Sequence, residues 1–196
     1  MDYNNSDLSY NVAQLLKERV GATRKLDVVA DELPLYQDGG EGLEAHDLTG
    51  TVKVTRLNEG VLVQGDVQAR VHVECSRCLT DIDLPVDAQL EEQFRPTVDV
   101  ETGRTVQQPV LGDDDDMVFD IDANHMMDLT EAVRQALLVA VDMRPLCRED
   151  CKGLCPECGA NRNEVDCGHE PEVGDARWAA LRDLNIGDFP VDRNSN

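Results

Sequence analysis

The sequence predicts an α+β fold: an antiparallel β-sheet or partial barrel with flanking helices, followed by a cysteine-rich C-terminal segment. Apolar and polar residues alternate through 61–74 and again through 82–90, which is the pattern of half-buried strands. Residues 128–141 carry apolar side chains at helical spacing. Five of the seven cysteines fall after residue 144. We therefore expect a mainly antiparallel β domain with two helices over 1–144, and a separate segment over 145–196.

The N-terminal part is predicted to begin with an amphipathic helix over residues 8–20. Leu8, Val12 and Leu15 fall on one face at helical spacing, and Gly21 then ends the helix. Because an apolar stripe of this kind is typical of a helix that packs on a core, we expect this helix to cover the sheet.

The strands of the sheet are expected next. A first strand is predicted within residues 24–35, and a glycine-containing loop over 34–47. A β-meander then begins, with a turn at 58–60. The long alternating strand runs directly into the motif Cys75-Ser76-Arg77-Cys78, and the alternation resumes after it. The motif should therefore lie at the tip of a long hairpin, which is a rigid place for two thiolates.

The region after the hairpin changes character. Residues 93–117 are predicted to form an acidic loop, because prolines and glycines interrupt them and 113–116 are four aspartates. The aspartate run lacks the glycine and the terminal glutamate of a calcium loop, so we interpret it as solvated. A short strand is expected within 117–121. Asp128 then opens the central helix, with Glu131 three residues later as in a capping box.

The C-terminal end is predicted to add one more short helix. Asp175 is expected to cap it, and Trp178, Leu181 and Leu184 share one side. We interpret the single tryptophan as closing a small core.

Charge and composition limit the classes of function that the chain can have. The net charge is −22, from 40 acidic and 18 basic residues. A chain this acidic is not a general nucleic-acid binder, because phosphate binding requires positive charge, and it suits a basic protein partner. The N-terminus lacks the pattern of a signal peptide, and the longest apolar run, 136–141, is too short to span a membrane. We expect a cytoplasmic protein with no membrane partner, and cysteines that bind metal in a reducing compartment.

The cysteines and one histidine form four ligand pairs. Zinc takes four sulfur or nitrogen ligands in a tetrahedron. Eight such ligands make two complete sites, so we expect one or two zinc ions and a zinc-ribbon-like segment from residue 145. The predicted ligands are the upstream pair (Cys75 and Cys78), the middle pair (Cys147 and Cys151), the third pair (Cys155 and Cys158) and the last pair (Cys167 and His169).

The pairing of these ligands has two solutions. Only eight residues separate the third pair from the last pair, so loop-closure entropy favours a local site built from these two. The middle pair would then meet the upstream pair across the fold. Alternatively, a single site lies wholly in the C-terminal stretch, and the upstream pair consists of free or redox-active thiols.

Basic residues gather near these motifs, against the acidic average of the chain. They could help to ionise the thiolates or contact RNA phosphate or an acidic surface, and the sequence leaves both interpretations open. The residues are Arg77, Arg144, Arg148, Lys152 and Arg162.

Three motifs carry a family resemblance: CSRCL at 75–79, DCKGLCPECGANRN at 150–163 and RWAALRDL at 177–184. With these motifs in this order, the chain resembles the large ribosomal RNA subunit accumulation proteins, the YceD-like family, in its cysteine-rich form. One departure is visible, because members commonly close with Cys-x-Cys where this chain has Cys167-Gly168-His169. Histidine is an acceptable zinc ligand, so we expect a mixed site.

The resemblance implies a cytoplasmic ribosome biogenesis factor that supports accumulation or processing of large-subunit (23S) rRNA. It implies binding to a large-subunit ribosomal protein, a large-subunit rRNA precursor or both, with no small-molecule substrate and no known enzymatic reaction. The acidity of the chain favours holding a basic ribosomal protein.

Two other classes of function are alternatives to ribosome biogenesis: a zinc deaminase and a thiol redox module. Zinc deaminases combine H-x-E with P-C-x-x-C, but here the H-x-E at 72–74 lies on a predicted strand and Cys147-x3-Cys151 has the wrong spacing. We therefore expect no enzyme. The upstream pair could cycle between dithiol and disulfide, but a hairpin lowers thiol pKa values less than a helix N-terminus does. A thiol-based redox or zinc-switch module is the alternative function.

Overall fold

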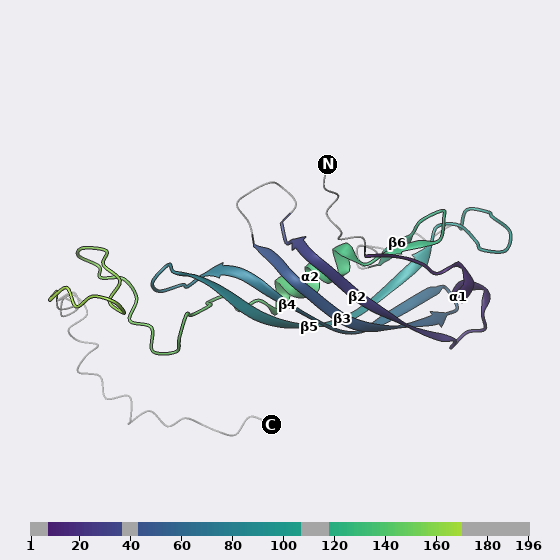
Figure 1. Ribbon diagram of the computed structural model, residues 1–196. Coiled ribbons are helices and arrows are strands. Elements are labelled where there is room, and N and C mark those ends of the chain that lie inside the picture. Colours follow the sequence, from purple (N-terminus) through teal and green to yellow (C-terminus); the bar gives the residue numbers. More distant parts are fainter. Residues whose placement is uncertain (1–7, 37–42, 107–117, 170–196) are drawn as a thin grey trace, which may run out of the picture. The chain divides into compact units, whose positions relative to one another are not determined.

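The computed structural model describes residues 8–36, 43–106 and 118–169 (Figure 1). Contacts divide the chain into two compact units, the first ending at Cys151 and the second beginning at Lys152. Cys147 and Cys151 are thereby grouped with the β-sheet. The division into domains at residue 144 stays a prediction.

The first unit is built on one seven-stranded sheet in the order β1-β7-β6-β5-β4-β3-β2. Neighbouring strands are antiparallel, except that β5 and β6 are parallel. The strands are β1 Ser9–Asn11, β2 Thr23–Pro34, β3 Glu44–Leu57, β4 Gly60–Glu74, β5 Asp81–Pro96, β6 Phe119–Ile121 and β7 Met126–Asp128; the helices are α1 Ala13–Lys17 and α2 Thr130–Ala140. The described residues are thus mainly β with two short helices, so the predicted α+β class holds only in part.

The β4–β5 hairpin is the longest pairing in the sheet and confirms the predicted meander. Its register runs from Val61 opposite Phe94 to Glu74 opposite Asp81. The predicted core-facing positions of β4 are all buried: Val61, Val63, Val67, Ala69, Val71 and Val73. The hairpin therefore carries residues 75–80 at its tip, as the alternation predicted (Figure 1).

The sheet curls into a half-barrel. A Cβ added to Gly50 would lie 2.5 Å from the carbonyl oxygen of Asp66, so only glycine allows the two strands to approach this closely. The β3–β4 register also shifts after His46. At the open side, the Tyr10 hydroxyl donates to the carbonyl of Asp27 at 2.8 Å and links the two edge strands, β1 and β2. The partial barrel predicted from the sequence is therefore present.

The predicted N-terminal helix over 8–20 is wrong in its extent. Residues 9–11 form β1 paired with β7, and only Ala13–Lys17 is helical. The backbone N–H of Leu129 donates to the carbonyl of Leu8, and that of Val12 to the carbonyl of His125. Leu8 is still buried, because the strand places it in the same core that a helix would have reached. A partner more than 110 residues away in sequence thus overrode the local pattern.

The central helix is confirmed, with a different start. α2 packs Ala132, Val133 and Leu137 into the core. The predicted cap at Asp128 is wrong, because Asp128 ends β7 and the N-cap residue is Leu129, which makes no side-chain capping bond. The Asp128 carboxylate does accept the backbone N–H of Thr130 at 2.9 Å, in a local turn that precedes the helix. Glu131 does not complete a capping box, because its carboxylate accepts the side chain of Gln135 instead.

The remaining predictions concern loops and short elements. The predicted strand within 24–35 and the short strand within 117–121 are confirmed as β2 and β6. The strands extend into both predicted loops, since β3 begins at Glu44 and β5 continues to Pro96. The aspartates at 113–116 and the helix expected from residue 175 lie outside the described residues. In the described part of the chain, no helix is long and apolar enough to cross a membrane.

Candidate metal centres

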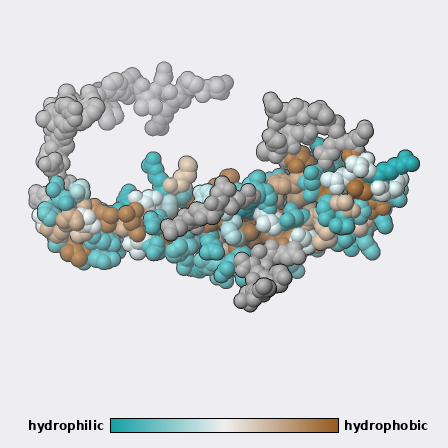
Figure 2. Space-filling view, turned by 90° about the horizontal axis from the view of Figure 1, so that it is seen from above, coloured by the Kyte–Doolittle hydropathy of each residue, from teal (hydrophilic) through white to brown (hydrophobic). Residues whose placement is uncertain are grey.

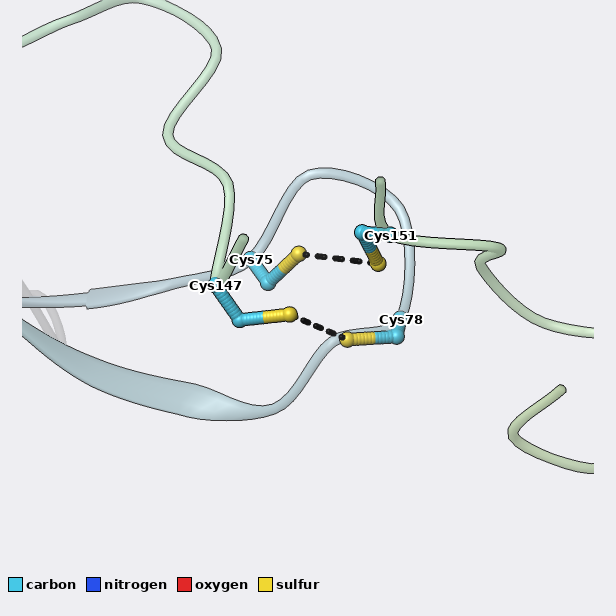
Figure 3. A group of neighbouring side chains, drawn as sticks. All are labelled: Cys75, Cys78, Cys147 and Cys151. Atoms are coloured by element: carbon cyan, nitrogen blue, oxygen red, sulfur yellow. Dashed lines mark hydrogen bonds between the residues drawn. The ribbon is translucent and has the colours of Figure 1, made fainter. Parts of the chain in front are cut away.

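The first cluster consists of Cys75 and Cys78 at the hairpin tip with Cys147 and Cys151 from the segment after α2 (Figure 3). The Sγ atoms of Cys75 and Cys151 lie 3.8 Å apart. Those of Cys78 and Cys147 lie 3.7 Å apart. A tetrahedral site with Zn–S bonds of about 2.3 Å has edges of about 3.8 Å, whereas a disulfide joins its sulfurs at about 2.0 Å. The four thiols are free and have the spacing of a metal site.

The hairpin tip forms a tight backbone knuckle. The N–H of Cys75 donates to the carbonyl of Thr80 at 2.9 Å, and the N–H of Leu79 donates back to the carbonyl of Cys75 at 2.9 Å. This turn requires a left-handed residue, and Leu79 occupies it with φ of +56°. A non-glycine residue in that region costs on the order of 1–2 kcal/mol. We call residues 75–80 the first knuckle.

Two hydrogen bonds attach the first knuckle to the segment that carries the other two cysteines. The N–H of Ser76 donates to the carbonyl of Pro145 at 2.8 Å. The Arg77 guanidinium donates to the carbonyl of Cys151 at 2.9 Å. Cys75 and Cys151 are consequently buried, at 0% and 3% exposure.

The second cluster consists of Cys155, Cys158, Cys167 and His169 and lies within the second unit. Cys155 Sγ lies 3.8 Å from Nδ1 of His169. The corresponding edge of a tetrahedral zinc site with one sulfur and one nitrogen is about 3.6 Å. All four ligand atoms lie within 4.8 Å of one another. The donor set is three sulfurs and one imidazole nitrogen.

The backbone of residues 155–160 repeats the first knuckle. The N–H of Cys155 donates to the carbonyl of Ala160, and the N–H of Gly159 donates to the carbonyl of Cys155, both at 2.8 Å. The left-handed position is here filled by Gly159, with φ of +71°. We call residues 155–160 the second knuckle. The equal C-x-x-C spacing of the two motifs indicated this shared geometry. The sequence alone did not predict that Leu79 takes the left-handed position that Gly159 takes in the second knuckle.

The second unit has almost no core of its own. Within the described residues 152–169, only Gly153 and Cys155 are buried. Hydrogen bonds hold the rest of this segment together. The N–H of Lys152 donates to the Asn163 side chain at 2.8 Å, and Leu154 forms an isolated β-bridge with Asn161. A segment this polar cannot fold on apolar burial, which is the situation in which a bound metal supplies the folding free energy.

Backbone N–H groups lower the pKa of one cysteine in each knuckle. Hydrogen bonds from the backbone of Cys147 and of Cys78 lower the pKa of Cys75 to about 6. The backbone N–H groups of Cys158 and Glu157 lower the pKa of Cys155 to about 6 in the same way. These two cysteines are therefore largely ionised at neutral pH.

The neighbouring thiols resist ionisation. Burial and the adjacent cysteines raise the pKa of Cys147 to about 12. For Cys158, the N–H of Ala160 favours ionisation, but the Cys155 thiolate and burial outweigh it and raise the pKa. The four thiolates of the first cluster, like the three of the second, repel one another at this spacing, so a full set of ionised ligands requires a cation among them. Both donor sets fit zinc, and both could hold a metal ion.

The structure thus brings all eight predicted ligands together in the two groups that loop closure favoured. Their binding of zinc stays a prediction. His72 lies outside both clusters, where its Nδ1 is 3.2 Å from the Asp83 carboxylate. The histidine of the H-x-E motif at 72–74 is therefore a surface residue paired with an aspartate, as expected if this motif is not a deaminase site.

The basic residues expected around the metal divide between the two units. Arg77, Arg144 and Arg148 belong to the first unit, and Lys152 and Arg162 to the second. Two of the first three have partners within the unit, since Arg77 binds a backbone carbonyl and Arg148 Nε lies 3.5 Å from Asp150. Asp150 therefore offsets part of the charge of Arg148, whereas Arg77 keeps its charge with one of its donors occupied.

Comparison with known proteins gives relatives and a family. An uncharacterized protein of Mycobacterium bovis is 35% identical over 133 residues, covering 68% of this chain and 59% of the relative. One of Mycobacterium leprae is 33% identical over 143 residues, covering 71% of this chain and 59% of the relative. The aligned part therefore spans about 59% of the length of these relatives. No solved structure matches the chain.

The sequence model of one family matches residues 63–185, a range that begins in β4 and includes both metal clusters. This is more than half of the chain, and it contains all three motifs that carried the resemblance. The chain belongs to the family described as large ribosomal RNA subunit accumulation protein YceD.

Proposed function

We propose that each cluster binds one structural zinc ion, and that the second unit is a zinc-ribbon-like module. The observation that carries this is the pair of Sγ–Sγ distances of 3.7 and 3.8 Å in the first cluster, which equal the edge of a zinc–thiolate tetrahedron. Four protein ligands fill a tetrahedron and leave no position for a substrate or an activated water. The zinc sites are therefore structural, and the protein has no enzymatic reaction at them.

We infer that the protein is a ribosome biogenesis factor that supports accumulation or processing of large-subunit rRNA. The family description supports this role, and the matched range contains the structural features that would carry it. The net charge of −22 favours a basic ribosomal protein of the large subunit as the direct partner, with any rRNA contact made through the basic residues beside the clusters.

The zinc content is tested by native mass spectrometry of the protein purified without added metal or chelator. The expected mass includes two zinc ions per chain. A chain that carries no zinc, and that binds none when zinc is returned under reducing conditions, rejects the metal assignment.

The ribosomal role is tested by affinity purification of the tagged protein from its own cells at low salt, with and without RNase. A large-subunit ribosomal protein that stays bound after RNase supports direct protein binding. Precursors of large-subunit rRNA that are lost with RNase support a role on assembling particles. If neither is enriched over an unrelated tagged acidic protein, the proposed role is wrong.

A zinc-release switch is the second candidate, and the exposure of Cys158 and His169 favours it. An oxidant such as hydrogen peroxide would take two electrons from two thiolates, which would join as a disulfide and no longer hold a metal, while the peroxide would take two protons from solvent and become two waters. Stoichiometric zinc release with loss of ribosomal association on mild peroxide treatment, reversed by thiol reductant, would favour this candidate.

A further inference from the structure

Leu79 occupies a position that the fold of its knuckle does not favour. Its φ of +56° lies in the left-handed region, and its side chain is 58% exposed. The same backbone position in the second knuckle is Gly159. Glycine adopts this conformation without a steric cost, whereas leucine pays that cost and recovers little of it by burial. Residues held in such conformations are concentrated at functional sites.

This combination separates Leu79 from the other exposed apolar residues. Val139 and Met143 are more exposed, at 87% and 95%. Scattered apolar residues are normal on a protein surface and need no explanation, and Figure 2 shows apolar areas interspersed with polar ones on the face in view. Among the described non-glycine residues with positive φ, the other two are Asp47 and His125, whose side-chain types tolerate this region better. Leu79 alone of the three is apolar.

Two carboxylates flank the first knuckle, at the last residue pair of the β4–β5 hairpin. Glu74 and Asp81 are opposite each other in the β4–β5 register, and the Asp81 side chain is 68% exposed, with Nε2 of His72 at 3.8 Å from its carboxylate. Like charges in such a pair destabilise a hairpin. Asp83 follows two residues later, with Nδ1 of His72 at 3.2 Å, and the Arg77 guanidinium keeps its positive charge while it donates to the carbonyl of Cys151. The three carboxylates outnumber this single guanidinium, so the hairpin tip presents an apolar side chain with an excess of negative charge beside it.

We propose that Leu79 anchors a docking surface for a basic protein segment, with Glu74 and Asp81 facing lysine or arginine side chains of that partner. Charge complementarity selects this occupant, because a partner cation relieves the Glu74–Asp81 repulsion and the whole chain carries a net charge of −22. Burial of Leu79 in an apolar pocket of the partner compensates its backbone cost. The proposal rests on the proposed function and identifies its partner surface.

The experiment compares three variants of the zinc-loaded chain of residues 1–196. Leu79→Gly removes the side chain and the backbone cost, Leu79→Ala removes the side chain but keeps most of that cost, and Val139→Ala is the control at another exposed apolar position. The probes are the proteins of the large ribosomal subunit, freed of rRNA and purified individually, titrated at low and at physiological salt. Naked large-subunit rRNA is titrated in parallel. Thermal unfolding of each variant is recorded.

Leu79→Gly should raise the Tm by about 2–4 °C and weaken binding of at least one basic protein by about tenfold or more. Leu79→Ala should weaken binding without the rise in Tm, and Val139→Ala should change neither. Equal binding by wild type and Leu79→Gly overturns the docking surface and leaves the ribosomal role intact. A lower Tm for Leu79→Gly also overturns it, because Leu79 would then serve the protein's own packing.

If no large-subunit protein binds wild type, the docking surface is rejected. Binding of the rRNA alone in that case retains a ribosomal role with RNA as the partner. Absence of both rejects the proposed function as well.

Discussion

The two knuckles have the same backbone conformation, but the segments that flank them differ greatly in burial. Both close with the same pair of hydrogen bonds and the same left-handed residue position. The first knuckle ends a hairpin whose strands pair without interruption from Val61 to Glu74, and its cluster is mostly buried. The second stands in a segment where only Gly153 and Cys155 are buried. A metal bound as proposed would therefore add to an existing fold in the first cluster and would replace a hydrophobic core in the second.

The largest expected effect is from Cys155→Ser. Loss of this ligand should unfold residues 152–169 and leave the sheet intact, because structural zinc supplies about 10–16 kcal/mol of apparent binding free energy to such segments. Limited proteolysis with mass spectrometry should locate new cleavage sites in the second unit only. A far-UV spectrum that shows loss of the whole fold would break the comparison.

The matched variant Cys75→Ser tests the other half of the comparison. It should release one zinc ion while the β-sheet keeps its far-UV signal, since the hairpin core does not depend on the metal. Collapse of the sheet in this variant would show that the first cluster, too, is a condition of folding.

The next effect is the order of metal loss. Cys158 and His169 are exposed, whereas three of the four ligands in the first cluster are buried. A chelator should therefore remove zinc from the second cluster first, about tenfold faster or more, in a release curve with two phases. His169→Cys adds a thiolate, and it should slow the first phase only. A single phase, or a first phase unchanged by this variant, would contradict the ranking.

A smaller effect is expected from Gly159→Ala. An added Cβ would meet no atom within 4 Å, so the cost is conformational only, about 1 kcal/mol for a non-glycine residue with positive φ. Because folding and metal binding are coupled in the second unit, zinc affinity should fall about fivefold in a competition titration. Gly103→Ala, also with positive φ and open space, is the control and should leave zinc affinity unchanged.

The smallest effect concerns the hairpin that supports the first knuckle. A hydrogen bond from His72, with the charge of His46, holds the pKa of Asp83 below its ordinary value of 3.8. A lowered folded-state pKa stabilises the protein above the unfolded pKa, and that contribution is lost as the pH falls through the folded value. The Tm difference between wild type and Asp83→Asn should be small at pH 6 and should vanish once the pH falls below the lowered pKa of Asp83. A difference that grows on acidification would contradict this.

Much of the sheet could be predicted because its signal is local. The alternation of Val61, Val63 and Val67 with polar residues specifies a half-buried strand within one segment, and the structure has that strand. The first helix was predicted too long because β1 exists only through pairing with β7, which no local window contains. The capping box failed for a related reason, since Glu131 has nearer partners along its own helix.

The sequence by itself determined the chemistry of this protein: four pairs of soft ligands, the hairpin that carries the first pair, and the acidic character of the chain as a whole. Residue type and short-range spacing are sufficient for these features, since they depend on a few consecutive residues. Only the tertiary structure decided that Cys147 and Cys151 join the hairpin tip. It also decided that Leu79 is held in a glycine-like conformation with its side chain in solvent. Both depend on contacts between segments about 70 residues apart, or on a backbone angle that closure of the turn imposes.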